Sequence, residues 1–165
     1  MTPFKITHEL RGDRDAYWKI FFDKEFTGEM YDRIGVKEWK ILAWKEEDGK
    51  LYREVKVVPK RDLPSMIKKV VKGDLGYIEH STLYWDRDFM ECNVKPTLLS
   101  EKTTVKATYK LEKVGEGRLR RTFEGTIEVK IPLLGSKVEK LVVDDMTRSY
   151  DVAAKVHQEW LDRTK

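Results

Sequence analysis

Arg121 is the residue whose type and position point most directly to chemistry. Along residues 119–129 every second side chain faces the apolar side of a predicted strand, and Arg121 lies on that side with Phe123 and Ile127. A buried guanidinium without a partner costs several kcal/mol. Arg121 must therefore find an acceptor or reach the mouth of a cavity.

Two carboxylates are candidate partners for Arg121. Glu79 shares a strand face with Tyr77, and Asp145, together with Ser149, interrupts the apolar face of the last helical stretch. One hypothesis is that Arg121 and either carboxylate form a polar anchor at the end of an apolar pocket. The alternative, which the sequence leaves equally open, is a structural ion pair at the rim of a sheet.

Signatures of metal or nucleophilic catalysis are scarce. His8, His80 and His157 lack metal-ligand spacing, and Cys92, the one cysteine, is interpreted as a buried apolar residue. Residues 86–88 have the Asp-x-Asp spacing that can hold a metal in glycosyl transfer, but turn chemistry explains them better. The sequence contains neither a nucleophile elbow nor a phosphate-binding loop. We therefore predict no catalytic residue, no metal and no cofactor.

Composition predicts one globular domain, residues 1–165, large enough to bury a core. Hydrophobic residues make up 40% and charged residues 38%, and no apolar run reaches the length of a transmembrane span. The amino-terminal residues do not resemble a signal peptide, so we expect a cytoplasmic location. The net charge is +4, with both signs interleaved, which argues against nucleic acid as a partner.

The first half of the chain predicts a strand, two short helices and a hairpin. Residues 3–11 alternate as a strand does, and Asp13 can cap the helical pattern that follows. A second helical pattern is broken at Gly28. Residues 36–47 and 50–58 predict a hairpin, because Asp48-Gly49 between alternating runs is a strong turn signal. Residues 66–72 form a basic amphipathic stretch, either a lid that touches anionic membranes or, as we favour, a single turn packed over the sheet.

Two further hairpins follow, over residues 77–96 and 103–129. In the second, a three-residue loop at 115–117 with Gly117 in the left-handed conformation places Ala107 opposite Gly125 and Leu111 opposite Arg121. The Ala107–Gly125 pair puts almost no side-chain volume in the middle of the sheet. This indicates a dry cavity, a large neighbour such as Met146 filling the gap, or a bend of the sheet.

The last quarter of the chain predicts one long amphipathic helix. After Pro132 and Gly135 neither proline nor glycine recurs, and apolar residues return from Val138 to Trp160 with the spacing of one helical face. About 27 helical residues make a rod of roughly 40 Å, longer than a small domain is wide.

This order of elements resembles the START and Bet v 1-like helix-grip superfamily, also called SRPBCC. The stretch with the greatest similarity is Arg120-Arg121-Thr122-Phe123-Glu124-Gly125-Thr126-Ile127-Glu128-Val129-Lys130-Ile131-Pro132-Leu133-Leu134-Gly135, continuing into the helix. The chain looks like an uncharacterised bacterial branch. It lacks the glycine-rich loop of the plant-allergen branch, so nothing about that branch's ligands carries over.

The resemblance implies an α+β helix-grip fold. A seven-stranded curved antiparallel sheet would wrap around a long C-terminal helix, with two short helices after the first strand. It also implies an internal cavity between sheet and helix, which would open among the loops around residues 59–64, 96–100 and 131–135.

We therefore predict that the chain binds, and as a carrier could transport, a hydrophobic small molecule such as a lipid, with transient membrane contact left open. One alternative is a polyketide cyclase or aromatase in which Arg121, Tyr109 or Glu79 handles protons; another is an interaction domain with a filled cavity. The residues expected to line the cavity are Trp39, Ile41, Val55, Tyr77, Val105, Ala107, Tyr109, Arg121, Phe123, Gly125, Ile127, Val142, Asp145, Met146, Ser149 and Ala153.

Overall fold

Seven antiparallel strands form one sheet in the order β1-β7-β6-β5-β4-β3-β2. The computed structural model describes residues 1–60, 64–69, 72–73 and 76–164. In chain order the elements are β1 (Thr2–Arg11), α1 (Arg14–Phe21), α2 (Lys24–Ile34), β2 (Val36–Glu47), β3 (Lys50–Pro59), α3 (Ser65–Lys68), β4 (Tyr77–Tyr84), the short 3₁₀ helix η1 (Trp85–Arg87), β5 (Phe89–Pro96), β6 (Thr103–Gly115), β7 (Arg118–Val129) and α4 (Gly135–Asp162).

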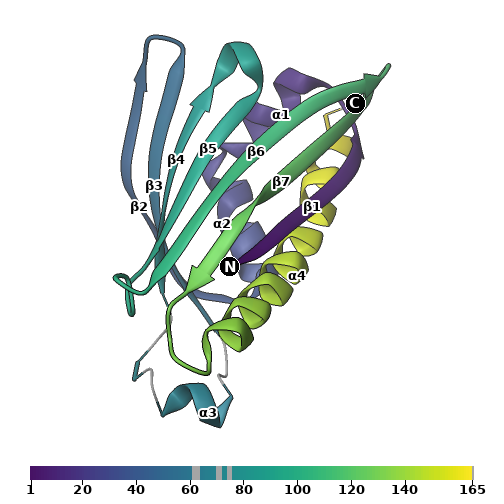
Figure 1. Ribbon diagram of the computed structural model, residues 1–165. Helices are drawn as coiled ribbons and strands as arrows, with labels where there is room; N and C mark the ends of the chain where they lie inside the picture. Colours follow the sequence, from purple (N-terminus) through teal and green to yellow (C-terminus); the bar gives the residue numbers. More distant parts are fainter. Residues whose placement is uncertain (61–63, 70–71, 74–75, 165) are drawn as a thin grey trace.

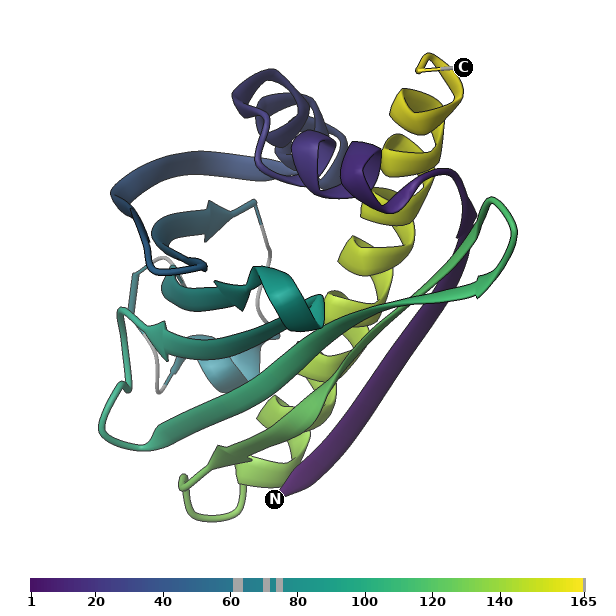
Figure 2. The ribbon, with the colours of Figure 1, turned by 90° about the horizontal axis from the view of Figure 1, so that it is seen from above.

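The sheet curves around α4, which lies on its concave side (Figures 1 and 2). Helices α1 and α2 cross the same side near the carboxyl-terminal half of α4, whereas α3 lies at the opposite end, near the start of α4 (Figure 1). This is the α+β helix-grip architecture expected from the sequence, with its two short helices after the first strand. No helix in the described ranges is long and apolar enough to span a bilayer.

Most predicted elements are confirmed, with two corrections. Helix α2 runs unbroken through Gly28, which lies beside the indole of Trp39 on β2. The last hairpin closes in a two-residue turn, because Gly115 already pairs with Arg118 after a bulge. Gly117 is left-handed as predicted. The predicted basic stretch is described only in part, since residues 70 and 71 lie outside the described ranges.

The register of the last hairpin is confirmed. Ala107 pairs with Gly125 and Leu111 with Arg121. A Cβ at Gly125 would lie 2.0 Å from the backbone oxygen of Lys106, so glycine allows β6 and β7 to approach closely where the sheet bends. This close approach, which was not among the alternatives considered from the sequence, accounts for the glycine at position 125.

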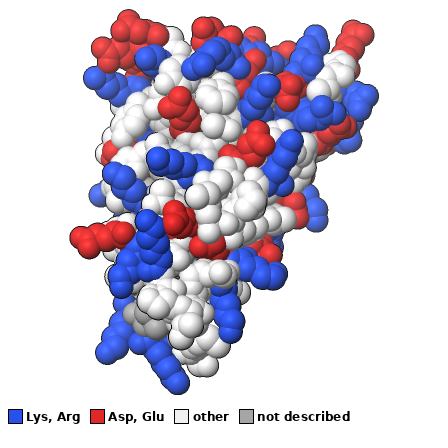
Figure 3. Space-filling model, viewed as in Figure 1, with Lys and Arg blue, Asp and Glu red and all other residues white. Residues whose placement is uncertain are grey.

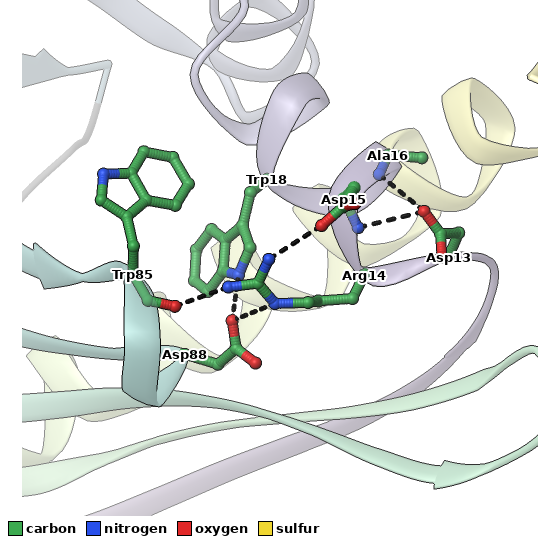
Figure 4. Close-up of polar contacts among 7 residues, drawn as sticks. All are labelled: Asp13, Arg14, Asp15, Ala16, Trp18, Trp85 and Asp88. Carbon is green, nitrogen blue, oxygen red and sulfur yellow. Dashed lines mark hydrogen bonds and ion pairs between the residues drawn. The ribbon is translucent and has the colours of Figure 1, made fainter. Parts of the chain in front are cut away.

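A polar cluster fixes α1 to the β4–β5 turn (Figure 4). Asp88, in the left-handed conformation, accepts hydrogen bonds from Arg14 Nε at 2.6 Å and from the indole of Trp18 at 3.0 Å. Arg14 also donates to the carbonyl oxygen of Trp85. Asp13 caps the first turn of α1, as predicted. The Asp-x-Asp spacing therefore serves as a turn and as an attachment point.

We expect Asp88→Ala to lower the free energy of unfolding by about 2–3 kcal/mol, since it removes two charge-assisted hydrogen bonds and places alanine at a left-handed position. Asp88→Asn, which tolerates that backbone and keeps an acceptor, should lose about half as much. Urea denaturation measures both variants. The exposed Asp86→Ala, in the same turn, is the control and should be neutral; equal losses for Asp86 and Asp88 would contradict this role.

Candidate ligand-binding cavity

Helix α4 is packed tightly at its two ends and loosely in its middle. Its buried residues are Gly135 and Glu139 near the start and Ala153, Val156, His157 and Leu161 in the last third. Gly135 is required at the start because a Cβ there would lie 2.2 Å from the carbonyl oxygen of Val129. None of residues 142–150, which lie between these ends, is fully buried, and the cavity-lining ones among them, such as Met146 and Ser149, are half-buried.

Glu139 attaches the first turns of α4 to the sheet. Its carboxylate is 3% exposed and accepts from the hydroxyl of Thr2 at 2.6 Å and from the backbone N–H of Val129 at 2.9 Å. These hydrogen bonds lower the pKa of Glu139, first through Thr2 and then through Val129. At the other end Gln158 bonds the backbone of Arg11 on β1.

Two adjoining cavities lie under the middle of α4. One of them, here called the α2 cavity because residues of α2 line it, has a volume of about 110 Å³. The other, here called the α3 cavity because Ile67 of α3 lines it, has a volume of about 140 Å³. By this measure one water molecule needs roughly 10–15 Å³. They share a wall of five residues, Tyr77, Glu79, Asp145, Ser149 and Tyr150. The α2 cavity is otherwise lined mainly by α2, β3 and the last third of α4. The α3 cavity is lined by β5–β7, α3 and the first half of α4.

Eleven of the sixteen residues expected to line a pocket do line one of these cavities. Tyr77, Asp145 and Ser149 belong to the shared wall; Tyr109, Arg121 and Ala153 line the α2 cavity; Val105, Phe123, Ile127, Val142 and Met146 line the α3 cavity. Their role in binding stays a prediction.

The other five residues do not line either cavity. Val55 and Ala107 are buried, 2% and 7% exposed, and Gly125 packs on the backbone of β6. Trp39 lies on the edge strand β2 against the ring of Tyr31, and Ile41 lies further along the same strand. The low-volume Ala107–Gly125 pair therefore does not open onto either cavity.

Arg121 is buried and bonded, but not to the expected carboxylates. Its guanidinium donates to the carbonyl oxygen of Tyr150 at 2.8 Å and to the hydroxyls of Tyr109 and Tyr17 at 3.3 and 3.4 Å. The two hydroxyls also hydrogen-bond each other. Neither Glu79 nor Asp145 is among the described hydrogen-bond partners of the Arg121 guanidinium. The predicted carboxylate anchor is thus wrong in its partners.

His8 connects the Arg121 guanidinium to the carboxylate of Asp151. Nε of Arg121 donates to Nδ1 of His8 at 3.4 Å, and Nε2 of His8 lies 2.7 Å from a carboxylate oxygen of Asp151 on α4. A neutral His8 with its proton on Nε2 satisfies both contacts. Burial lowers the pKa of His8, and Arg121 lowers it further against the opposing effect of Asp151.

Sequence reasoning missed several residues that line the α2 cavity. Arg53 is 6% exposed on the inner face of β3, and its position between Leu51 and Val55 on that face was visible in the same alternation that singled out Arg121. Tyr150 and His157 gave no comparable signal, because a helical pattern of aromatic residues is typical of any packed helix.

Among the described ranges no group of three or more metal-ligating side chains comes together. Cys92 is buried on β5, and burial raises its pKa well above the usual value, as expected of an inert core thiol.

A family model described as "Protein of unknown function (DUF2505)" matches residues 5–161. The chain belongs to this family. No curated protein sequence matches the chain.

Solved structures share the fold of this DUF2505 chain at low sequence identity. TTHA0849 from Thermus thermophilus has a TM-score of 0.69 at 13% identity, over 99% of both chains. Zhui aromatase/cyclase from Streptomyces sp. R1128 has a TM-score of 0.67 at 11% sequence identity, and the match covers 98% of this chain and 94% of the Zhui chain. A START superfamily protein from Mycobacterium smegmatis has 0.58 at 14%, over 99% of both. The DUF2505 chain therefore has the helix-grip fold of START/SRPBCC proteins.

His157 lies at the end of the α2 cavity and is neutral in the folded chain. Its ring stacks on Tyr17 at 3.9 Å between ring centres, and its Nε2 donates to the Tyr17 carbonyl oxygen at 3.1 Å. Burial, reinforced by the charge of Arg121, lowers the pKa of His157 to about 3. In the unfolded chain His157 becomes protonated near pH 6.5, whereas in the folded chain it stays neutral down to about pH 3. The free energy of unfolding therefore decreases as the pH falls through 6.5.

Between pH 7 and pH 5 we expect His157 to account for a loss of about 2 kcal/mol in the free energy of unfolding. His157→Gln keeps a donor for the Tyr17 carbonyl oxygen but cannot be protonated, so its stability should fall less over this range by about that amount. Urea denaturation at both pH values measures the difference. An unchanged pH dependence in the Gln variant would contradict a neutral, buried His157.

Proposed function

We propose that this DUF2505 protein binds an apolar or amphipathic small molecule, most simply a lipid, between its sheet and α4, and acts as a carrier or sensor. The observation that carries the proposal is the pair of adjoining cavities under the half-buried middle of α4. Helix-grip proteins typically hold hydrophobic small molecules at this place, which adds support from the fold.

The chemistry of the lining suits such a ligand. Aliphatic and aromatic side chains dominate the α3 cavity, among them Phe123, Ile127, Val142 and Met146. Apolar enclosure supplies affinity through the area removed from water, and a few polar groups set the orientation of the ligand. Those polar groups lie mainly in the shared wall and in the α2 cavity.

Native mass spectrometry of protein purified from its own host tests the proposal. We expect a co-purifying lipid that organic extraction removes and that rebinds when added back. An empty protein that takes up no lipid would contradict the carrier and favour an interaction domain. Turnover of an added polyketide would instead support the cyclase or aromatase alternative, for which the likeness to Zhui supplies the fold alone.

Filling the shared wall should abolish lipid binding. Ser149→Trp places an indole where both cavities meet, so we expect at least a tenfold loss of affinity, measured by displacement of a fluorescent lipid. Thr147→Trp, on the exposed side of the same helix, is the matched control and should bind as the unaltered chain does. Equal affinity for both variants would place the ligand elsewhere.

We also propose that the α3 end of the protein touches a membrane when ligand is exchanged. Leu133 is 99% exposed in the loop before α4, and Met66 of α3 is 46% exposed. Lys68, Lys69 and Lys72 are exposed close by in the sequence, and Figure 3 shows Lys and Arg gathered at this end on the side in view. Apolar side chains framed by lysines favour an anionic lipid surface.

Leu133→Asn should weaken binding to vesicles that contain phosphatidylglycerol by about tenfold, because it removes one exposed leucine from the contact. Asparagine tolerates the left-handed conformation of residue 133, so the melting temperature should not fall. Co-sedimentation with vesicles measures the partition. Unchanged sedimentation would exclude Leu133 from the contact.

A further inference from the structure

Arg53 is a second buried guanidinium, and its surroundings differ from those of Arg121. It lies on the inner face of β3 and lines the α2 cavity at 6% exposure. The rings of Phe21 and Phe22 lie 5.3 and 5.0 Å from its guanidinium carbon. Such rings attract the cation through their π-electrons. They carry no nitrogen or oxygen atom, so they cannot accept the hydrogen bonds that the guanidinium N–H groups donate in the plane of the group.

Those donors lack an acceptor within the described part of the chain. Nε of Arg53 is fully buried and makes no hydrogen bond, and the side chain makes no ion pair with a described residue. Arg121, by contrast, donates to a carbonyl oxygen, two hydroxyls and a histidine nitrogen. Burying a charge without hydrogen bonds is costly, so Arg53 is placed for an acceptor that the described residues do not supply.

Glu79 is the nearest acidic candidate and does not fill that role. It pairs across the sheet with Val55, one step along the inner face from Arg53, and lines both cavities without a hydrogen bond to Arg53. Burial raises the pKa of Glu79, and the charge of Arg53 offsets this only in part. A raised pKa weakens the case for Glu79 as the counter-charge of Arg53.

The two cavities differ in charge. The lining of the α2 cavity includes four cationic residues, Arg53, Lys60, Arg121 and Arg148. Arg148 is already paired with Asp145 at 3.4 Å. The described residues that line the α3 cavity include no Lys or Arg. An amphiphile that spans the shared wall would therefore place its anionic head in the α2 cavity and its tail in the α3 cavity.

We propose that Arg53 binds the carboxylate of a long-chain acid whose tail lies in the α3 cavity. The inference rests on the proposed function and names its ligand class. A carboxylate matches the planar fork of one guanidinium and carries one negative charge, which suits Arg53, whose Nε has no acceptor among the described residues. A phosphate monoester shares the anionic chemistry but carries more charge than this single cation balances.

Displacement of the neutral dye Nile red by matched fourteen-carbon probes tests the inference. The probes are myristate, myristyl alcohol and myristyl phosphate. We expect the unaltered chain to bind myristate at least tenfold more tightly than the alcohol and more tightly than the phosphate. Arg53→Met should remove this preference by weakening myristate at least tenfold, since a hydrogen-bonded charge is lost, and should leave the alcohol within about twofold.

Arg120→Met is the matched control, because it removes one positive charge from the outer face, where Arg120 pairs with Glu9. It should leave both affinities unchanged. Arg53→Lys, which keeps the charge without the fork, should bind myristate with intermediate affinity. Melting curves of each variant, recorded without ligand, establish that the variants fold.

The possible outcomes distinguish a failure of the carboxylate site from a failure of the proposed lipid-binding function. Equal binding of myristate and alcohol, with neither affected by Arg53→Met, would overturn the carboxylate site and leave the apolar cavity standing. A preference for the phosphate probe that depends on Arg53 would replace the carboxylate by a phosphate head. If none of the probes displaces the dye, the proposed function fails, and the carboxylate site fails with it.

Discussion

Glu139 near one end of α4 and His157 near the other fix the helix to the rest of the chain. The first binds β1 and β7 through its carboxylate, and the second stacks on α1 and bonds its backbone. A helix of 28 residues held at both ends against a curved sheet cannot follow the curvature between them. The space left under residues 142–150 is where the two cavities lie.

The two buried arginines on the concave face differ in the groups that compensate their charge. Arg121 keeps its charge among hydroxyls, a carbonyl oxygen and a neutral histidine whose other nitrogen meets Asp151. Arg53 has two aromatic rings and an unpaired Nε. Both arginines line the α2 cavity, but of the two only Arg53 has an N–H group, at Nε, without an acceptor among the described residues.

The two parts of the proposed binding site differ in charge and in their distance from the exposed α3 end, so they would orient an amphipathic ligand. Cationic side chains line the α2 cavity, whereas the α3 cavity lies towards the end where Leu133 and Met66 are exposed beside lysines. A ligand that enters from that end would do so head first and leave its tail near the loops. In this proposal the two cavities and the exposed α3 end are parts of one path for a lipid.

Alternation, Asp-Gly turns and helical spacing are local signals, so the strands, the long helix and most of the turns could be predicted from the sequence, whereas the bulge that shortens the last hairpin turn could not. The sequence also placed Arg121 on the dry face and gave its register against Leu111. It could not decide what Arg121 binds, since Tyr17, Tyr150 and His8 come from three elements that only tertiary packing brings together. Nor could it reveal that the Ala107–Gly125 pair lies away from the two cavities, or that Arg53 Nε has no acceptor among the described residues. Which buried polar groups are satisfied depends on atoms far apart along the chain, and that was decided by the tertiary structure alone.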